Sequence, residues 1–276
     1  MRCAWQELLG VLPIWMRERT DVLGRGRLQE LRMRLDRPPE LIMGSEVHRL
    51  EKPITPGDIS FVINTASRYS PWAAETISQG FLTVAGGHRI GICGECVIDQ
   101  GQLKGFRQVT SLCIRVARDI RGIADTLPSE GSILIIGSPG TGKTTLLRDL
   151  IRQRSANGVS SIAVVDERGE IFPKGFEQGN HTDVLNGCSK PQGISMALRT
   201  MGPGTIAVDE ITDQLDADAL QQALWCGVDI LATAHAASCE DLHSRAVYRT
   251  LLESGLFQTL VILQPDKSWR TERISL

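Results

Sequence analysis

The sequence predicts an α/β protein, in which a C-terminal domain built on a parallel sheet follows a smaller α+β N-terminal domain. Three observations carry this prediction. From Ser132 onward, short apolar runs alternate with longer amphipathic segments, as strands alternate with helices. The apolar runs are continuous, which is typical of strands that helices cover on both faces. Before about residue 110, the segments are shorter and are interrupted by Gly and Pro.

In the N-terminal part, we expect an amphipathic helix and a hairpin. Apolar residues recur at helical spacing within residues 4–12, so this segment is expected to form a helix that Pro13 ends. Residues 81–84 and 90–98 lie on either side of a Gly-Gly pair and are expected to form a hairpin. The predicted domains are 1–110 and 131–276, with a linker at 111–130.

In the C-terminal part, we expect five strands joined by right-handed crossovers. The expected strands are 133–136, 162–165, 206–208, 230–233 and 259–263. The expected helices are 143–154, 194–200, 213–226 and 242–253. The glycine-containing stretch 168–193 shows little periodicity, so we expect it to lack regular structure. It would either contact another subunit or a membrane partner, or be a plain insert.

Composition limits the classes of function. The chain has 276 residues, of which 42% are hydrophobic and 22% charged, and this excludes a collagen-like chain and a disulfide-dense miniprotein. Thirty basic and 32 acidic side chains give a net charge of −2, which offers no bulk attraction to nucleic acid. No apolar run approaches the roughly 18 residues of a membrane span, and no signal peptide is recognisable. We therefore expect a cytoplasmic protein.

The cysteines favour reduced thiols rather than a metal site or disulfides. There are seven of them at irregular spacing, an odd number. Cys93 and Cys96 form a single C-x-x-C pair, and His88 and Cys113 nearby do not complete a ligand set of dependable spacing. We expect ordinary thiols in a Gly-rich hairpin.

The strongest motif is a phosphate-binding loop. Residues 137–144 match G-x-x-x-x-G-K-[ST] between an expected strand and an expected helix. In such a loop, backbone N–H groups and the helix N-terminus face phosphate oxygens. Lys143 would contact the β- and γ-phosphates of ATP, and the Thr144 hydroxyl would bind Mg²⁺. The predicted nucleotide-binding residues are Gly137, Ser138, Pro139, Gly140, Thr141, Gly142, Lys143, Thr144 and Thr145.

Acidic residues follow two other expected strands and are candidates for holding the metal and activating water. After the third strand, Asp209 is predicted to bind Mg²⁺, and Glu210 to orient and deprotonate the attacking water. Glu167 follows the second strand and would reach the same edge of the sheet. Glu210 is the first candidate for the general base and Glu167 the second. Alternatively, Glu167 forms a surface salt bridge with Arg168.

The fourth expected strand also ends in polar residues at this edge. Thr233 or His235 could bond the γ-phosphate or the attacking water and so report hydrolysis. Alternatively, His235 is a buried histidine that bonds a backbone carbonyl. A strand inserted between the strand before the phosphate loop and the strand before Asp209 is typical of RecA-like and AAA-like ATPases. The fold predicted for 131–276 is therefore a RecA-like (AAA/ASCE) P-loop domain.

Together, these motifs resemble those of a known family. The segments 137–144, 165–168, 206–210 and 232–235 are similar to the Walker A motif, Asp box, Walker B motif and His box of type II and type IV secretion ATPases and pilus retraction motors. With the Gly-rich segment 77–91, the chain most resembles the stage III sporulation protein AA family. Two features depart from the secretion motors: Val-Asp-Glu replaces their usual Gly-Glu, and a four-cysteine zinc insertion is absent.

The resemblance implies a cytoplasmic ATPase that uses ATP and Mg²⁺. Such a protein would form a hexameric ring at the base of the channel complex between mother cell and forespore. Its partners would be further copies of itself and membrane-embedded channel proteins in the mother cell, with no direct nucleic acid and no transmembrane segment of its own. Two other functions stay open: a nucleotide-gated assembly scaffold with incidental hydrolysis, and a RecA-like ATPase acting on DNA or RNA.

Hydrolysis also needs a cation on the far side of the γ-phosphate. Such an arginine increases the rate by about 10³ to 10⁵. We expect an arginine from the N-terminal domain or the linker to complete a neighbouring subunit's site. The candidates are Arg89, Arg107, Arg115, Arg118, Arg121 and Arg199.

Overall fold

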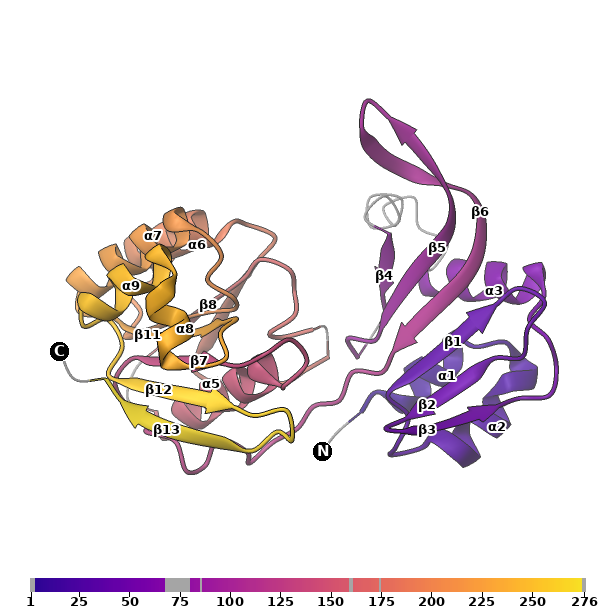
Figure 1. The fold of residues 1–276 in the computed structure, drawn as a ribbon, viewed down its shortest axis with the longest axis horizontal. Helices are drawn as coiled ribbons and strands as arrows, with labels where there is room; N and C mark the ends of the chain where they lie inside the picture. Colours follow the sequence, from indigo (N-terminus) through magenta and orange to yellow (C-terminus); the bar gives the residue numbers. More distant parts are fainter. Residues whose placement is uncertain (1–2, 68–79, 85, 159–160, 174, 275–276) are drawn as a thin grey trace. The chain divides into compact units, whose positions relative to one another are not determined.

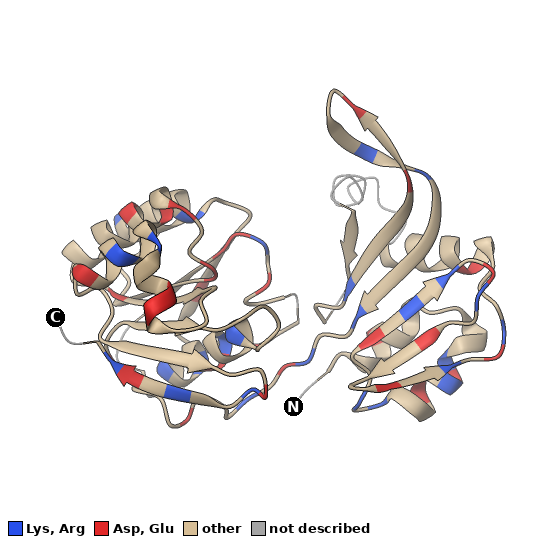
Figure 2. Ribbon diagram, in the orientation of Figure 1, with Lys and Arg blue, Asp and Glu red and all other residues tan. Residues whose placement is uncertain are grey.

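The chain forms two compact units, each with its own sheet and core (Figure 1). The computed structural model describes residues 3–67, 80–84, 86–158, 161–173 and 175–274. Unit 1 comprises residues 1–119 and 173–176, and unit 2 comprises residues 120–172 and 177–276. Acidic and basic residues are mixed on the strands and helices of unit 1 (Figure 2).

Unit 1 is built on a six-stranded sheet in the order β3-β2-β1-β6-β5-β4, with every neighbouring pair antiparallel. Its strands are β1 (Glu30–Arg34), β2 (Glu40–Met43), β3 (Glu46–Arg49), β4 (Phe81–Thr83), β5 (Arg89–Asp99) and β6 (Gln102–Arg115). β4 and β5 form the predicted hairpin, with Leu82 opposite Ile90. β5 and β6 continue beyond the other strands as a two-stranded ribbon (Figure 1).

In the described part of unit 1, three helices share a core with this sheet. They are α1 (Trp5–Val11), α2 (Ile14–Gly24) and α3 (Pro56–Ser67). α1 matches the helix predicted at 4–12, and Pro13 separates it from α2, which the sequence pattern did not predict. Leu8 and Met16 from the helices and Leu31 and Ile114 from the strands are fully buried in one core.

Unit 2 is built on a seven-stranded sheet in the order β13-β12-β7-β11-β10-β8-β9. Its strands are β7 (Ile133–Ile136), β8 (Ile162–Asp166), β9 (Thr182–Asn186), β10 (Thr205–Val208), β11 (Asp229–Ala234), β12 (Thr259–Leu263) and β13 (Trp269–Arg273). All neighbouring pairs are parallel except β12 and β13. The five predicted strands are present. The expectation that 168–193 lacks regular structure is wrong, because β9 lies within it.

Helices cover both faces of the unit 2 sheet (Figure 1). They are α5 (Lys143–Asn157), α6 (Lys190–Thr200), α7 (Gln214–Trp225), α8 (Cys239–Ser244) and α9 (Ala246–Glu253). α6, α7 and α9 share a core with Leu134 and Ile206 on one face, and α5 contacts β7 and β11 from the other. The single helix predicted at 242–253 is wrong: Arg245, with extended backbone angles, separates α8 from α9.

The order of the strands explains where the predicted site assembles. β11 lies between β7 and β10, so the polar residues that follow all three strands emerge at the carboxyl edge of one parallel sheet. Ligands bind at this edge in open α/β sheets. In the described part of the chain, no helix combines the length and apolar composition required to span a membrane.

Candidate nucleotide-binding site

Residues 137–142 form a tight loop between β7 and α5. Gly140 and Gly142 have φ angles of +80° and +104°, a backbone region that residues with a Cβ rarely adopt. The loop folds back on itself, because the backbone N–H and the hydroxyl of Thr141 both donate to the carbonyl of Ser138. The loop then leads into α5, whose N-terminus carries a partial positive charge. The predicted phosphate-binding loop therefore has the expected setting between a buried strand and a helix.

Lys143 is the first residue of α5 and turns back into the loop. Its Nζ donates to the carbonyl oxygens of Gly137 at 2.8 Å and Ser138 at 3.1 Å. A third bond, of 2.9 Å, reaches Nδ1 of His235 at the end of β11. Burial lowers the pKa of Lys143, although the negative charges of Asp209 and Glu210 oppose this shift. Lys143 is thus held at the centre of the polar edge.

Asp209 joins the phosphate loop to the end of β10. Its Oδ2 accepts a 2.9 Å hydrogen bond from the hydroxyl of Thr144, and its Oδ1 accepts one of 2.6 Å from the hydroxyl of Thr233. The two residues predicted to bind Mg²⁺, Thr144 and Asp209, therefore lie side by side. Both offer oxygen atoms, and protein Mg²⁺ sites commonly use one or two such ligands together with phosphate oxygens. The residues fit this ion.

Glu210 is connected to the phosphate loop through His235. Its Oε1 is 3.3 Å from Nε2 of His235, whose Nδ1 accepts the hydrogen bond from Lys143. Because an ammonium group only donates, this contact requires Nδ1 of His235 to be the acceptor, while Nε2 faces Glu210. Lys143, His235 and Glu210 thus form a continuous polar chain. The alternative in which His235 bonds a backbone carbonyl does not describe the contacts of its ring.

Glu167, the second candidate for the general base, contacts Lys190. Its Oε2 accepts a 2.9 Å hydrogen bond from Nζ of Lys190, so the alternative considered for it, a surface salt bridge with Arg168, is not the contact that it makes. Lys190 also lies 3.2 Å from Oδ2 of Asp216. Burial would lower the pKa of Lys190, but the bonds to Glu167 and Asp216 outweigh it and raise the pKa.

Sequence reasoning missed Lys190, although one signal was available. It is the first residue of α6, directly before a proline, and a positive charge is unfavourable at a helix N-terminus. A lysine in that position indicates a compensating carboxylate nearby. The structure supplies two of them.

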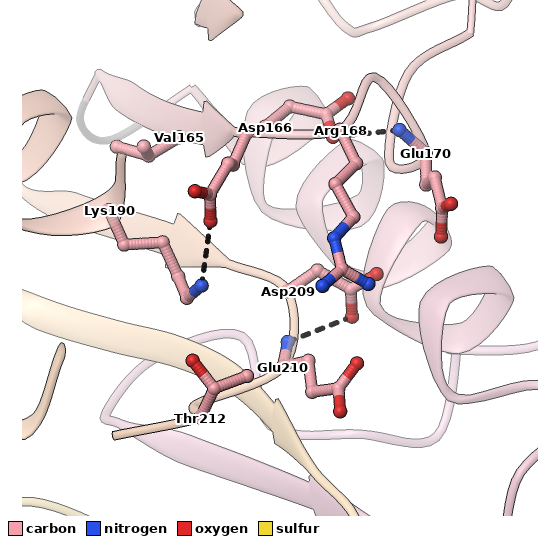
Figure 3. Close-up of a pocket in the computed structure, with 9 residues that line it drawn as sticks. Val165, Asp166, Arg168, Glu170, Lys190, Asp209, Glu210 and Thr212 are labelled. Carbon is pink, nitrogen blue, oxygen red and sulfur yellow. Dashed lines mark hydrogen bonds and ion pairs between the residues drawn. The ribbon is translucent and has the colours of Figure 1, made fainter. Parts of the chain in front are cut away.

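A pocket lies between the ends of β8 and β10 (Figure 3). Its lining residues are Val165, Asp166, Glu167, Arg168, Glu170, Lys190, Asp209, Glu210 and Thr212. Asp166 serves the fold, because its two carboxylate oxygens accept the backbone N–H groups of Glu170 and Phe172. Arg168 is exposed and extends toward Asp209 (Figure 3). It is a cation at this edge that the predicted arginine set did not include.

The six predicted arginines occupy both units. Unit 1 holds Arg89, stacked over the Phe81 ring; Arg107, ion-paired with Glu95; Arg115, near Glu30; and Arg118, which donates to the carbonyl of Leu28. Unit 2 holds Arg121, ion-paired with Glu177, and Arg199 on α6. Neither Arg121 nor Arg199 lines the pocket.

The cysteines of the C-x-x-C pair lie on the exposed part of β5. Cys93 and Cys96 are both free and exposed. Within the described ranges, no group of three or more His, Cys, Asp or Glu side chains could hold a metal ion.

The sequence matches a known family along nearly the whole chain. The profile of the family described as "Sporulation stage III, protein AA" matches residues 6–273. The chain belongs to this family. Stage III sporulation protein AA of Bacillus subtilis (strain 168) is 36% identical over 280 residues, which cover 95% of this chain and 91% of that protein. Members of the stage III sporulation protein AA family thus share nearly the whole chain, including unit 1.

Solved structures show the same architecture. The pilus retraction motor PilT with bound ADP superimposes with a TM-score of 0.66 at 16% identity, covering 91% of this chain and 78% of that one. The ATPase DotB of Legionella pneumophila gives a TM-score of 0.62 at 17% identity, covering 95% and 80%. The likeness confirms the predicted fold class: unit 2 is a RecA-like P-loop domain, preceded by a smaller α+β domain.

Proposed function

We propose that this chain binds ATP with Mg²⁺ at residues 137–145 and hydrolyses the γ-phosphate bond. The observation that carries the proposal is the direct hydrogen bond between Thr144 and Asp209, because it joins the two motifs that handle the metal in P-loop ATPases. The second support is the chain of contacts from Lys143 through His235 to Glu210. A loop folded this way for structural reasons alone would not require a carboxylate from another strand.

Each polar residue of the site has its own task in binding or hydrolysis. Lys143 and the N–H groups of the loop bind the phosphates, and Thr144 and Asp209 hold Mg²⁺, which would draw electron density from the phosphate oxygens. Glu210 orients the attacking water and accepts its proton. His235 lies between Lys143 and Glu210, so its contacts change when Lys143 moves onto a phosphate.

The cellular role follows from the family and is part of the same proposal. The chain acts as a cytoplasmic motor or regulator at the base of the mother cell to forespore channel complex during sporulation. It works as a hexamer with membrane-embedded channel proteins as partners. An arginine from a neighbouring subunit completes the site, and direct binding to nucleic acid is not expected.

The test measures nucleotide binding, assembly and turnover on one preparation. Calorimetry with ATP and Mg²⁺ reports binding, and light scattering after size exclusion reports the number of subunits with and without nucleotide. Phosphate release is then measured for the wild-type chain and for Lys143→Ala. We expect binding, assembly and turnover in the wild type, and loss of binding and turnover in Lys143→Ala.

The combination of binding, assembly and phosphate release distinguishes the proposed ATPase from the two alternative functions. A folded wild-type chain that binds neither ATP nor ADP rules out the proposal. Binding and assembly without phosphate release would instead support a nucleotide-gated scaffold. Turnover that rises with DNA and falls steeply with salt would indicate the nucleic-acid-dependent ATPase.

A further inference from the structure

The backbone at Glu210 is unusual and must be held by its surroundings. Its φ angle is +34°, in the left-handed region that residues other than glycine seldom adopt. A residue persists in this region only when neighbouring contacts fix it, and such residues cluster at functional sites. The contacts of residues 210–212 therefore indicate which parts of the molecule set the position of the Glu210 carboxylate.

Two sets of contacts on these residues come from β11 and α9. The N–H of Glu210 donates to the hydroxyl of Thr233 at 2.9 Å, and the N–H of Ile211 donates to the Thr233 carbonyl at 2.9 Å. The carbonyl of Ile211 accepts a 2.7 Å bond from the buried hydroxyl of Tyr248. These contacts involve neutral groups and hold the segment from one side.

The third set ends on a buried charge. The N–H and the hydroxyl of Thr212 both donate to Oδ2 of Asp216, at 2.9 and 2.8 Å. The Asp216 side chain is only 5% exposed, and a buried carboxylate requires a compensating cation. Lys190 provides that cation, since its Nζ lies 3.2 Å from the same Oδ2.

Lys190 binds a second carboxylate with the same ammonium group. Its Nζ donates to Glu167, which is thereby tied to the N-terminus of α6. Glu210 is instead connected through His235 to Lys143 in the phosphate loop. The two candidate bases thus have different partners, although both line the same pocket.

We propose that Lys190 is a positioning residue for Glu210. Its ammonium compensates the charge of Asp216. Asp216 in turn accepts two hydrogen bonds from Thr212 and so fixes the strained backbone at Glu210. The same ammonium engages the carboxylate of Glu167, the second candidate base. The expected effect on turnover rests on the proposed ATPase function, whereas the expected effect on the backbone does not.

Amide hydrogen exchange of the full-length chain tests the backbone part. In Lys190→Met, which keeps the length of the side chain and removes its charge, the amides of residues 210–212 should exchange at least about tenfold faster. The amides within α5 should be unchanged. Arg270→Met, which removes an exposed cation from edge strand β13, is the matched control and should behave as the wild type.

Steady-state kinetics of the same variants test the catalytic part. Lys190→Met should lower kcat by about tenfold or more, because a small misplacement of a catalytic group is costly. KM for ATP should change by no more than about twofold. Thr212→Val removes the hydroxyl bond to Asp216 and leaves the N–H bond and the buried ion pair in place, so it tests the same contact with a smaller disturbance of the fold. Its effect should have the same direction and be smaller.

The outcomes separate this inference from the proposed function. If the wild type hydrolyses ATP and both variants match its kcat and its exchange, Lys190 does not position Glu210. A loss of kcat accompanied by an equal loss of ATP affinity would mean that Lys190 only supports the fold, which also overturns the inference. If the wild type releases no phosphate, the proposed function fails, and the exchange of residues 210–212 alone decides whether Lys190 holds this backbone.

Discussion

At the scale of single residues, neighbouring side chains distinguish the two carboxylates at the sheet edge. Glu210 lies 3.3 Å from His235, which bonds the lysine of the phosphate loop. Glu167 bonds Lys190 on α6. A base must reach the water that attacks the γ-phosphate, and the connection to the phosphate loop favours Glu210 for this task.

Replacing Glu210 or Glu167 by glutamine should distinguish the roles of the two carboxylates. Glu210→Gln should lower kcat for ATP by about 100-fold or more, since the loss of a general base typically costs 10² to 10⁴. Glu167→Gln should keep kcat within about tenfold of the wild type. Single-turnover phosphate release, with ATP affinity measured in parallel, gives the comparison. The reverse ranking would assign the base to Glu167.

His88 gives a prediction about pH. It is fully buried in unit 1, where its Nδ1 accepts the N–H of Ala117 and its Nε2 bonds the carbonyl of Ala4. Burial lowers the pKa of His88 below its ordinary value of about 6.5. Below that pH the unfolded chain binds a proton that the folded chain does not, so stability falls as pH decreases, with a slope of up to about 1.4 kcal/mol per pH unit.

The measurement is the free energy of unfolding of wild type and His88→Gln, by denaturant, at pH 7.5 and pH 5.5. The variant should be less stable at pH 7.5 but should lose less stability on acidification. Carboxylates titrate in both proteins, so the difference between the two pH dependences isolates His88. Parallel curves would show that His88 does not titrate between the folded and unfolded states.

At the scale of elements, α6 packs so close to the sheet that its contact residue, Gly193, leaves no room for a side chain. A Cβ added at Gly193 would lie 2.4 Å from Cγ1 of Val165 on β8 and 3.0 Å from the Cys188 sulfur. This close approach places the start of α6, and therefore Lys190, beside the end of β8. The packing of a helix thus sets the position of a charged group in the pocket.

Gly193→Ala should therefore destabilise unit 2. We expect a loss of about 1 to 3 kcal/mol, which is typical of an overpacked core contact. Gln192→Ala, at an exposed position of the same helix, should change stability by no more than about 0.5 kcal/mol. Thermal and denaturant unfolding of the three proteins would check this, and equal stability would mean that the helix can move away from β8 at little cost.

The elements that sequence reasoning found and missed differ in burial. Strands such as β7 and β10 are buried along their whole length and appear as continuous apolar runs, so the pattern identifies them. β9 and β13 lie at the two edges of the sheet, where residues are half-buried or exposed and the apolar signal is weak. The break between α8 and α9 at Arg245 was not predictable either, because the apolar residues on both sides of it continue one helical pattern.

The candidate site was predicted to the extent that its residues follow local motifs. The phosphate loop, Asp209, Glu210 and His235 each end or follow a recognisable strand, and the structure brings them together. The role of Lys190 depends on contacts with residues 23 and 26 positions away in sequence. The local signal, a lysine at the start of a helix, indicates that a carboxylate lies nearby but does not identify which one.

At the scale of the whole molecule, we propose that a second copy of the chain completes the site. The pocket lining includes one arginine, Arg168, and none of the six predicted arginines. Four of those six belong to unit 1, whose own fold is that of a separate α+β domain. A subunit that offers an arginine to its neighbour would couple hydrolysis to assembly.

Mixing experiments test this shared site. A Lys143→Ala chain, which we expect not to bind nucleotide, is combined with chains in which one predicted arginine is replaced by alanine. If the arginine acts in trans, the Lys143→Ala subunit supplies it, and activity should recover partly, as seen in phosphate release plotted against mixing ratio. Arg168→Ala serves as the contrasting case, because an arginine that acts within its own subunit is not rescued. Absence of recovery at every ratio, for all six arginines, would refute the shared site.

If the loop binds nucleotides as proposed, the hydrogen bonds of Lys143 affect which nucleotides it accepts. The lysine already bonds two backbone carbonyls and an imidazole, so an incoming ligand has to replace these partners with acceptors of its own. The lysine of such a loop contacts the β- and γ-phosphates, and a diphosphate or triphosphate supplies at least one of these groups whereas AMP has neither. We expect discrimination against monophosphates to arise from this exchange of partners, before any contact with the base or the sugar is made.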